Sequence, residues 1–192
     1  MANVLPNYVL QSMCTSTVVI GALLASSKLV HAEDRFFNEL RFGASTSIQS
    51  GRSREDGVFP EVVALFDPFG FEQVTGWKQQ LLHPRLHAGS SIGTFGEATQ
   101  FYGGLTWTVD LGEKLFVEAG FGGAVHTGNL DEDDNGPDLG SRLLFREYLA
   151  AGINLQDGWR LVAQVAHASN ASICDGPNEG MTRAGVLVAY KF

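Results

Sequence analysis

The last eleven residues, Thr182–Phe192, read TRAGVLVAYKF and carry the clearest fold signal in the chain. Apolar side chains occupy every second position from Ala184 to Phe192, and the positions between them include the charged residues Arg183 and Lys191. Successive side chains of a β-strand point to opposite faces. The alternation therefore predicts a strand with one apolar face and one face that carries charge.

Short alternating segments of the same kind recur between turn signals throughout the chain after residue 32, where no helical period of useful length occurs. The sequence predicts eight strands, which begin near Phe37, Glu61, Leu82, Gln100, Leu115, Arg142, Trp159 and Thr182. This pattern indicates an all-β fold.

The face opposite the apolar side chains carries charges of both signs: Glu39, Arg41, Arg85, Glu118, Arg146, Arg183 and Lys191. A small membrane barrel has such a polar interior and turns its apolar face to lipid, whereas a soluble barrel or sandwich shows the reverse. Periodicity alone does not say which face is inside. Strands of about ten residues, an export signal and the terminal aromatic Phe192 favour an eight-stranded antiparallel transmembrane β-barrel.

The N-terminus has the features of that export signal. An apolar run from Thr17 to Ser26 precedes Val30-His31-Ala32, which has the small-x-small form of a cleavage site. We expect residues 1–32 to be a signal peptide and residues 33–192 to be a barrel in the bacterial outer membrane. Loss of Lys28 with the signal changes the formal net charge from −8 to −9. Such an acidic exported protein is not expected to bind nucleic acid.

With both termini on the periplasmic side, short periplasmic turns should alternate with longer outer loops. Three long polar segments fit the outer loops: Ser47–Pro60, Thr127–Gly140 and Ser172–Met181. Pro68–Leu81 is the exception, because it should be periplasmic and is too long for a tight turn. Either the second strand is misplaced or an interfacial segment interrupts the barrel, and the structure of residues 50–81 is left open.

The run His167-Ala168-Ser169-Asn170 precedes the closing strand. Residues two apart on a strand share a face, with Cα atoms about 7 Å apart, so the imidazole of His167 can reach the hydroxyl of Ser169. A serine hydroxyl becomes a strong nucleophile when a neighbouring base takes its proton. The seventh strand should run outward and turn this pair to the lipid at outer-leaflet depth. An acyl ester of lipopolysaccharide is then the natural substrate.

Glu147 is the first candidate for an acid that supports His167. Gln156-Asp157-Gly158 suits a three-residue hairpin loop, which pairs Leu155 with Trp159 and brings Glu147 opposite His167. A carboxylate among lipid-facing side chains is costly unless it has a partner. Glu147 could therefore fix the tautomer of His167, although a register slip of two residues would remove the pairing.

These residues also carry a resemblance. The run from His167 to Ala171, followed by Pro177-Asn178-Glu179-Gly180 and a final strand that ends in Phe192, is similar to the PagL-type lipid A 3-O-deacylases. That family is an eight-stranded outer-membrane barrel that hydrolyses the ester-linked acyl chain at the 3 position of lipid A. The resemblance implies Ser169 as nucleophile, His167 as base and Asn170 as a contributor to the oxyanion hole.

The chain departs from the family pattern at the acid. The position that matches the family's acid is Thr182, which cannot serve as a carboxylate. Glu179 is an alternative to Glu147 as the acid, and we prefer Glu147 on geometry.

The leading hypothesis is an outer-membrane serine esterase that acts on lipid A, its partner in the outer leaflet, and needs no cofactor. The first alternative is a non-catalytic eight-stranded barrel used for adhesion or envelope structure. The second is a secreted, soluble ligand-binding barrel. The acidic run Asp131–Asp134 begins like a calcium loop, but Arg142 takes the place of the bidentate glutamate, so we assign no metal site. Self-association as a homodimer is left open.

Overall fold

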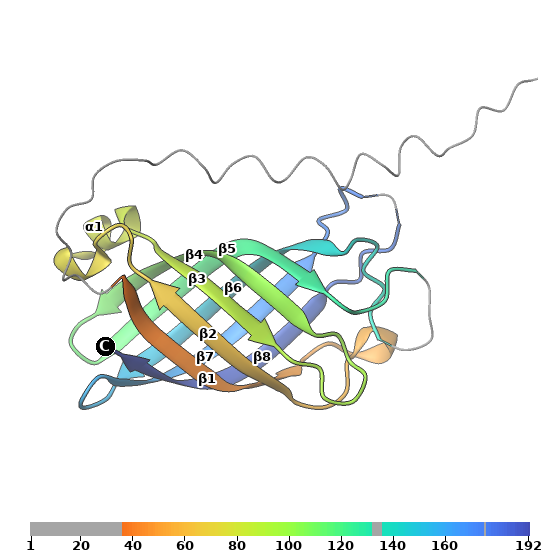
Figure 1. Ribbon diagram of the computed structural model, residues 1–192, viewed down its shortest axis with the longest axis horizontal. Coiled ribbons are helices and arrows are strands. Elements are labelled where there is room, and N and C mark those ends of the chain that lie inside the picture. The colour runs from red at the N-terminus through yellow and green to blue at the C-terminus, as the bar shows by residue number, and fades with distance from the viewer. Residues whose placement is uncertain (1–35, 132–135, 175) are drawn as a thin grey trace, which may run out of the picture. The chain divides into compact units, whose positions relative to one another are not determined.

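The computed structural model describes residues 36–131, 136–174 and 176–192, so the expected signal peptide, residues 1–32, lies outside the described residues. Within these ranges eight strands form a closed barrel, in which each strand pairs with the next and β1 pairs with β8 (Figure 1). All eight pairs are antiparallel. The predicted all-β, eight-stranded antiparallel barrel is confirmed. The strands are β1 (Phe37–Ser47), β2 (Phe59–Phe66), β3 (Arg85–Ser91), β4 (Gln100–Leu111), β5 (Leu115–His126), β6 (Leu143–Asn154), β7 (Trp159–Ser169) and β8 (Met181–Lys191).

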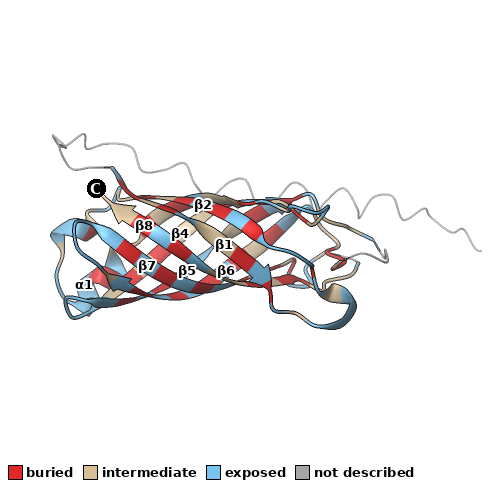
Figure 2. Ribbon diagram, turned by 90° about the horizontal axis from the view of Figure 1, so that it is seen from below, coloured by how far each residue is buried: buried red, intermediate tan, exposed pale blue. Residues whose placement is uncertain are grey.

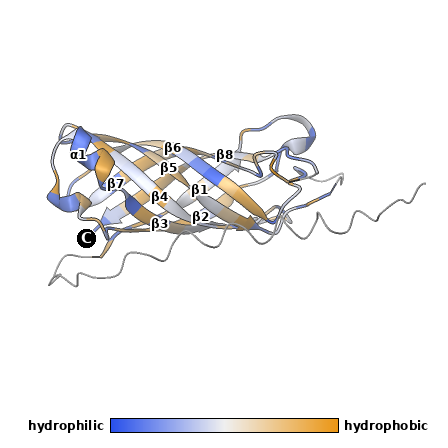
Figure 3. Ribbon diagram, turned by 90° about the horizontal axis from the view of Figure 1, so that it is seen from above, coloured by the Kyte–Doolittle hydropathy of each residue, from blue (hydrophilic) through white to orange (hydrophobic). Residues whose placement is uncertain are grey.

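Side chains alternate between the inside and the outside of the barrel along each strand, so buried and exposed positions alternate along the ribbons (Figure 2). In β7, for example, Leu161 and Val165 are exposed whereas Val162 and Gln164 are buried. Figure 3 shows hydrophobic residues distributed along the strands of the wall. The apolar side of the sheet therefore faces outward.

The interior is closed by a network of buried ion pairs. Arg41 donates to both carboxylate oxygens of Glu118, at 2.7 and 2.8 Å, and to Glu39 at 2.6 Å. Arg85 donates to the same two carboxylates at 2.8 Å, and Arg160 donates to Glu39 at 2.7 Å. Buried charges are tolerated when they are paired and hydrogen-bonded in this way. A polar interior and an apolar exterior exclude the soluble barrel with an apolar cavity.

The connection between β2 and β3 contains the 3-10 helix η3 (Phe71–Gln73) and the short helix α1 (Trp77–Leu82). The sequence left two alternatives for residues 68–81, a misplaced second strand or a segment that interrupts the barrel, and the second alternative is therefore correct. The buried side chain of Gln80 donates to Asp110 Oδ2 at 2.7 Å and accepts from the Asp110 N–H at 3.1 Å, which docks α1 on the end of β4. β3 consequently begins at Arg85, three residues later than predicted.

The short 3-10 helix η2 (Gly51–Ser53) lies in the loop after β1, so residues 50–81 now have a described course. In the described part of the chain no helix is long and apolar enough to cross a membrane.

The two ends of the barrel differ in their connections. Short turns of residues 112–114 and 155–158 and the helical connection of residues 67–84 lie at the end that holds the C-terminus (Figure 1). Residues 48–58, 92–99 and the described parts of residues 127–142 and 170–180 lie at the other end. Because β7 is antiparallel to β8, its last residues lie at the end with the long loops. The end of β7 therefore lies next to the described part of residues 170–180.

Candidate active site

His167 and Ser169 lie at the end of β7 on its outward face, as predicted. Both side chains are half-buried, whereas their neighbours Ala166, Ala168 and Asn170 are buried. Among the described residues no hydrogen bond joins Ser169 to His167. Catalytic hydrogen bonds are often long in the absence of substrate and tighten in the Michaelis complex, so this geometry does not disqualify the pair.

The strands on either side of β7 place one residue directly opposite His167 each. On β6 this residue is Glu147, so the predicted register is confirmed, and on β8 it is Thr182. His167 Nδ1 lies 2.8 Å from Thr182 Oγ1, which is hydrogen-bond distance. Glu147 is exposed, and within the described ranges it forms no ion pair or hydrogen bond with His167. The hydroxyl of Thr182, and not a carboxylate, contacts the imidazole.

Gly180 closes the other side of the imidazole. A Cβ atom at this position would lie 2.7 Å from His167 Cε1 and 3.1 Å from Nε2, and the residue has a φ of +67°. Left-handed backbone of this kind favours glycine. The chain can pass this close to the histidine ring because residue 180 has no side chain.

Asn170 is buried and connects three segments. Its Nδ2 donates to the carbonyls of Leu139 at 2.9 Å and Pro177 at 3.0 Å, and its Oδ1 accepts from the N–H of Ser172 at 2.7 Å. Its backbone N–H donates to Asn178 Oδ1 at 3.0 Å. Both amide hydrogens are thus donated to the loops above the barrel. The oxyanion role of Asn170 stays a prediction, and it requires one of these bonds to open.

Glu179 forms a second connection between the loops, which we call the Glu179 clip. Its Oε2 accepts from the backbone N–H of Asp138 at 3.0 Å, and its Oε1 accepts from Arg52 at 3.4 Å. Arg52 also donates to Asp138 Oδ2 at 2.8 Å. The Asp138 N–H, aided by Ser53 and Arg52, lowers the pKa of Glu179 although partial burial opposes the shift. The carboxylate is engaged with these loops, and no hydrogen bond between it and His167 occurs in the described chain.

Gln49 is a neighbour of the candidate site that could not be predicted from the sequence. Its Nε2 donates to the carbonyls of Gly180 at 3.1 Å and Glu179 at 3.4 Å, and its Oε1 accepts from the N–H of Thr182 at 2.8 Å. It therefore holds the chain on both sides of the segment that contacts His167. No signal in the sequence pointed to it, since it lies in a loop whose course is set by the closed barrel.

A shallow apolar groove lies on the outer surface next to the histidine. Small and branched apolar side chains of β6, β7 and β8 line it, among them Leu149, Ala151, Ala163, Val165, Ala184 and Val186. Val165 pairs with Leu149 on one side and with Ala184 on the other, and it is the outward residue that precedes His167 on β7. The groove therefore begins one outward position from the histidine, on the lipid-facing surface.

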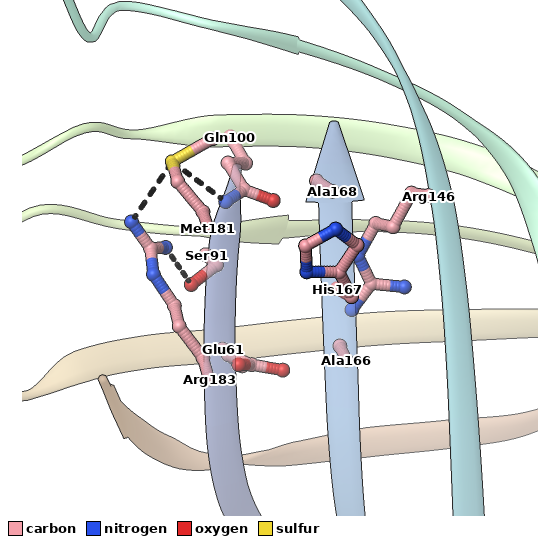
Figure 4. Close-up of a pocket in the computed structure, with 9 residues that line it drawn as sticks. All are labelled: Glu61, Ser91, Gln100, Arg146, Ala166, His167, Ala168, Met181 and Arg183. Carbon is pink, nitrogen blue, oxygen red and sulfur yellow. Dashed lines mark hydrogen bonds between the residues drawn. The ribbon is translucent and has the colours of Figure 1, made fainter. Parts of the chain in front are cut away.

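The inner side of the wall offers much less space. The cavity there, which Figure 4 shows with Arg146, Arg183 and Glu61 around it, has room for about one water molecule. Arg183 is committed to a pair with Glu55, and its guanidinium also stacks 3.5 Å from the ring of Phe59. His167 also borders this cavity, which is too small for anything larger than a water molecule. Within the described ranges no cluster of three or more histidine, cysteine or acidic side chains could hold a metal ion.

The barrel is closed, and it has an apolar exterior and a charged interior. These features define a membrane-spanning β-barrel, and the polar residues at the end of β7 form a candidate site on its lipid-facing surface. The chain belongs to the lipid A 3-O-deacylase (PagL) family, whose sequence model matches residues 67–191. The family and the fold place it in the bacterial outer membrane.

Two solved structures share the architecture. The crystal structure of the outer membrane enzyme PagL is 19% identical, with a TM-score of 0.63 over 80% of this chain and 99% of that chain. The N-terminal β-barrel domain of Pseudomonas aeruginosa OprF is 10% identical, with a TM-score of 0.50 over 82% of this chain and 98% of that one. At these identities the likeness shows the fold alone. No curated protein sequence matches this chain.

Proposed function

We propose that this protein is an outer-membrane serine esterase that removes the ester-linked acyl chain at the 3 position of lipid A. The observation that carries the proposal is the outward face of β7, where His167 and Ser169 lie beside an apolar groove. A water-soluble ester would not meet this face in a membrane, whereas the acyl chains of an outer-leaflet lipid run along it. Membership of the lipid A 3-O-deacylase family supports the same substrate.

In the proposed reaction the oxygen of Ser169 attacks the ester carbonyl while His167 accepts the hydroxyl proton. The tetrahedral intermediate then collapses, and the bond between the carbonyl carbon and the sugar 3-oxygen breaks. The sugar oxygen takes the proton from His167, and the acyl chain stays on Ser169. Water, deprotonated by His167, then attacks the acyl-enzyme, and the fatty acid leaves as the proton on His167 passes to the Ser169 oxygen. No cofactor enters either half of the reaction.

The oxyanion of the intermediate needs hydrogen-bond donors, and Asn170 is proposed as one of them. To donate to substrate, its amide must release the carbonyl of Leu139 or Pro177. Of the two acids that the sequence offers as a support for His167, Glu147 lies opposite His167 on the neighbouring strand and would have to rotate toward the ring to act. The carboxylate of Glu179 is already engaged in the Glu179 clip.

A fluorophosphonate probe tests the nucleophile directly. We expect the detergent-solubilised barrel to be modified at Ser169, because a serine activated by histidine attacks phosphorus and displaces fluoride. Peptide mass spectrometry locates the adduct. Ser169→Ala should abolish labelling and His167→Ala should slow it by about a hundredfold or more. Ser45→Ala, which removes a buried interior hydroxyl, is the matched control and should label normally.

The same experiment bears on the alternative function. An intact barrel that is not modified at Ser169, or is modified equally in the His167→Ala variant, would contradict the esterase. It would favour the non-catalytic barrel used for adhesion or envelope structure, because a fold can persist without its activity.

A further inference from the structure

We propose that Thr182 is the residue that orients His167, so that the base of this enzyme is supported by a hydroxyl and not by an acid. The inference rests on the proposed esterase function. It starts from one contact: among the described residues, Thr182 Oγ1 is the side-chain group that lies within hydrogen-bond distance of His167 Nδ1, at 2.8 Å.

Thr182 is held in place by its backbone. Its N–H donates to Gln49 Oε1 at 2.8 Å, and its carbonyl accepts from the N–H of Ile48 at 3.0 Å. Its Cα is paired with that of His167 across the β7–β8 ladder. A threonine in a strand has few accessible χ1 rotamers, so a fixed backbone also fixes the position of its hydroxyl.

The two candidate carboxylates do not have this relation to the imidazole. Glu147 is exposed on the β6 side of β7 and forms no contact with His167 Nδ1 in the described part of the chain. The Glu179 clip engages the other carboxylate with the Asp138 N–H and Arg52. The imidazole thus has a hydroxyl beside Nδ1, and within the described ranges neither carboxylate is hydrogen-bonded to it.

The chemistry of a hydroxyl partner differs from that of an acid in two ways. When Thr182 Oγ1 accepts the Nδ1 hydrogen, the lone pair of Nε2 is available to take the proton of Ser169, as in a triad. The first difference is that a hydroxyl can also donate to Nδ1, which puts the ring hydrogen on Nε2 and leaves that nitrogen unable to accept the proton of Ser169. The second difference is that a hydroxyl carries no charge to stabilise the imidazolium that forms when Ser169 attacks. Thr182 therefore orients the base and gives a slower enzyme than a carboxylate would.

Four variants at this position test the assignment, with steady-state hydrolysis of lipid A in detergent as the assay. Thr182→Val removes the hydroxyl at nearly constant shape and should lower kcat about tenfold, the effect of one neutral hydrogen bond, with KM unchanged. Thr182→Ser should restore most of kcat. Thr182→Glu and Thr182→Asp supply a charged acceptor and should raise kcat above wild type, about tenfold for the better-fitting one. Heat-modifiable migration on a gel confirms that each barrel is folded.

The outcomes separate this inference from the proposed function. If Ser169→Ala is inactive but Thr182→Val keeps the kcat of wild type, the esterase stands and Thr182 has no role. Loss of activity in Glu147→Gln together with a silent Thr182→Val would assign the supporting role to Glu147. A fall in both Thr182→Val and Thr182→Ser, with folded barrels, would also overturn the inference, because the hydroxyl would not matter. If Ser169→Ala is as active as wild type, the proposed function itself is wrong.

Discussion

Gly180 and His167 show how closely the candidate site depends on single atoms. The backbone at Gly180 passes so near the imidazole that a Cβ would lie 2.7 Å from Cε1. Contacts of that length force a neighbouring group to move, and the group that would move here is the proposed base. The glycine thus limits where the ring can lie, while the Thr182 hydroxyl acts on Nδ1 from the β8 side.

We predict that Gly180→Ala lowers kcat about tenfold or more, because displacement of the imidazole by a fraction of an ångström disturbs the attack geometry. Gly51→Ala is the matched control. Gly51 has a φ of +68°, nearly that of Gly180, but a Cβ there meets nothing within 4 Å. Both substitutions carry a similar left-handed strain of about 1 kcal/mol, and the clash with the imidazole adds to it in Gly180→Ala alone. Stability should therefore fall in both variants, whereas activity should fall in Gly180→Ala alone. Equal activity of the two variants would contradict the contact as a catalytic constraint.

The residues of the site were predictable to different degrees. His167 and Ser169 could be found because their spacing and the strand period are visible in the sequence. The contact of Thr182 with Nδ1 could not be predicted, because position 182 was considered only as a possible site for the acid. The hydrogen bond also depends on a side-chain rotamer, which the sequence does not show. Gln49 could not be found either, because it is far away in sequence and reaches the site through the closure of β1 against β8.

At the scale of the elements, one turn sets the register of the proposed site. Gly158 has the positive φ that the predicted three-residue loop requires, and Leu155 N–H donates to the carbonyl of Trp159. Asp157 has a positive φ as well, which that loop does not require. That pairing propagates along β6 and β7 and brings Glu147 opposite His167. Hairpin registers are readable from sequence because the turn chemistry is local. The course of residues 68–84 was not readable, since η3 and α1 form against the end of the barrel.

The loops above the site are fastened by the Glu179 clip, and its pH dependence follows from its hydrogen bonds. The Asp138 N–H lowers the pKa of Glu179 below its ordinary value of 4.5. A lowered folded-state pKa stabilises the folded loops at pH values above the unfolded pKa. This stabilisation is lost as the pH falls through the folded-state value, so the loops should be fastened at neutral pH and loosen below about pH 4.5.

We predict that the amide proton of Asp138 titrates with a midpoint below pH 4.5 in nuclear magnetic resonance spectra of the detergent-solubilised barrel. The Arg52→Gln variant should raise that midpoint, and Glu179→Gln should abolish the titration. The amide of Thr127, which donates to the Thr99 carbonyl at 3.0 Å in the same group of loops, is an internal control and should not follow this midpoint. A midpoint above pH 4.5, or one that survives Glu179→Gln, would contradict the clip.

On the scale of the whole molecule, the barrel is polar inside and apolar outside. The interior ion pairs place paired charge inside the lumen, and the small cavity beside Arg146 leaves no space for a lipid; the pairs join Arg41, Glu118, Glu39, Arg85 and Arg160. Reactive groups must therefore face the membrane to meet one. Alternation along the strands predicted both faces, and the expected export signal, the strand length and the terminal Phe192 indicated which one is inside.

We propose above all that the outward pair of Ser169 and His167 hydrolyses lipid A in the outer leaflet. The decisive measurement is mass spectrometry of lipid A from cells that produce the wild-type protein, Ser169→Ala or His167→Ala, in a host whose lipid A carries an ester-linked 3-position acyl chain. We expect loss of one 3-hydroxyacyl chain with the wild-type protein and intact lipid A with both variants, at equal amounts of folded barrel. Intact lipid A with all three proteins, also in detergent extracts, or equal deacylation by Ser169→Ala, would contradict it.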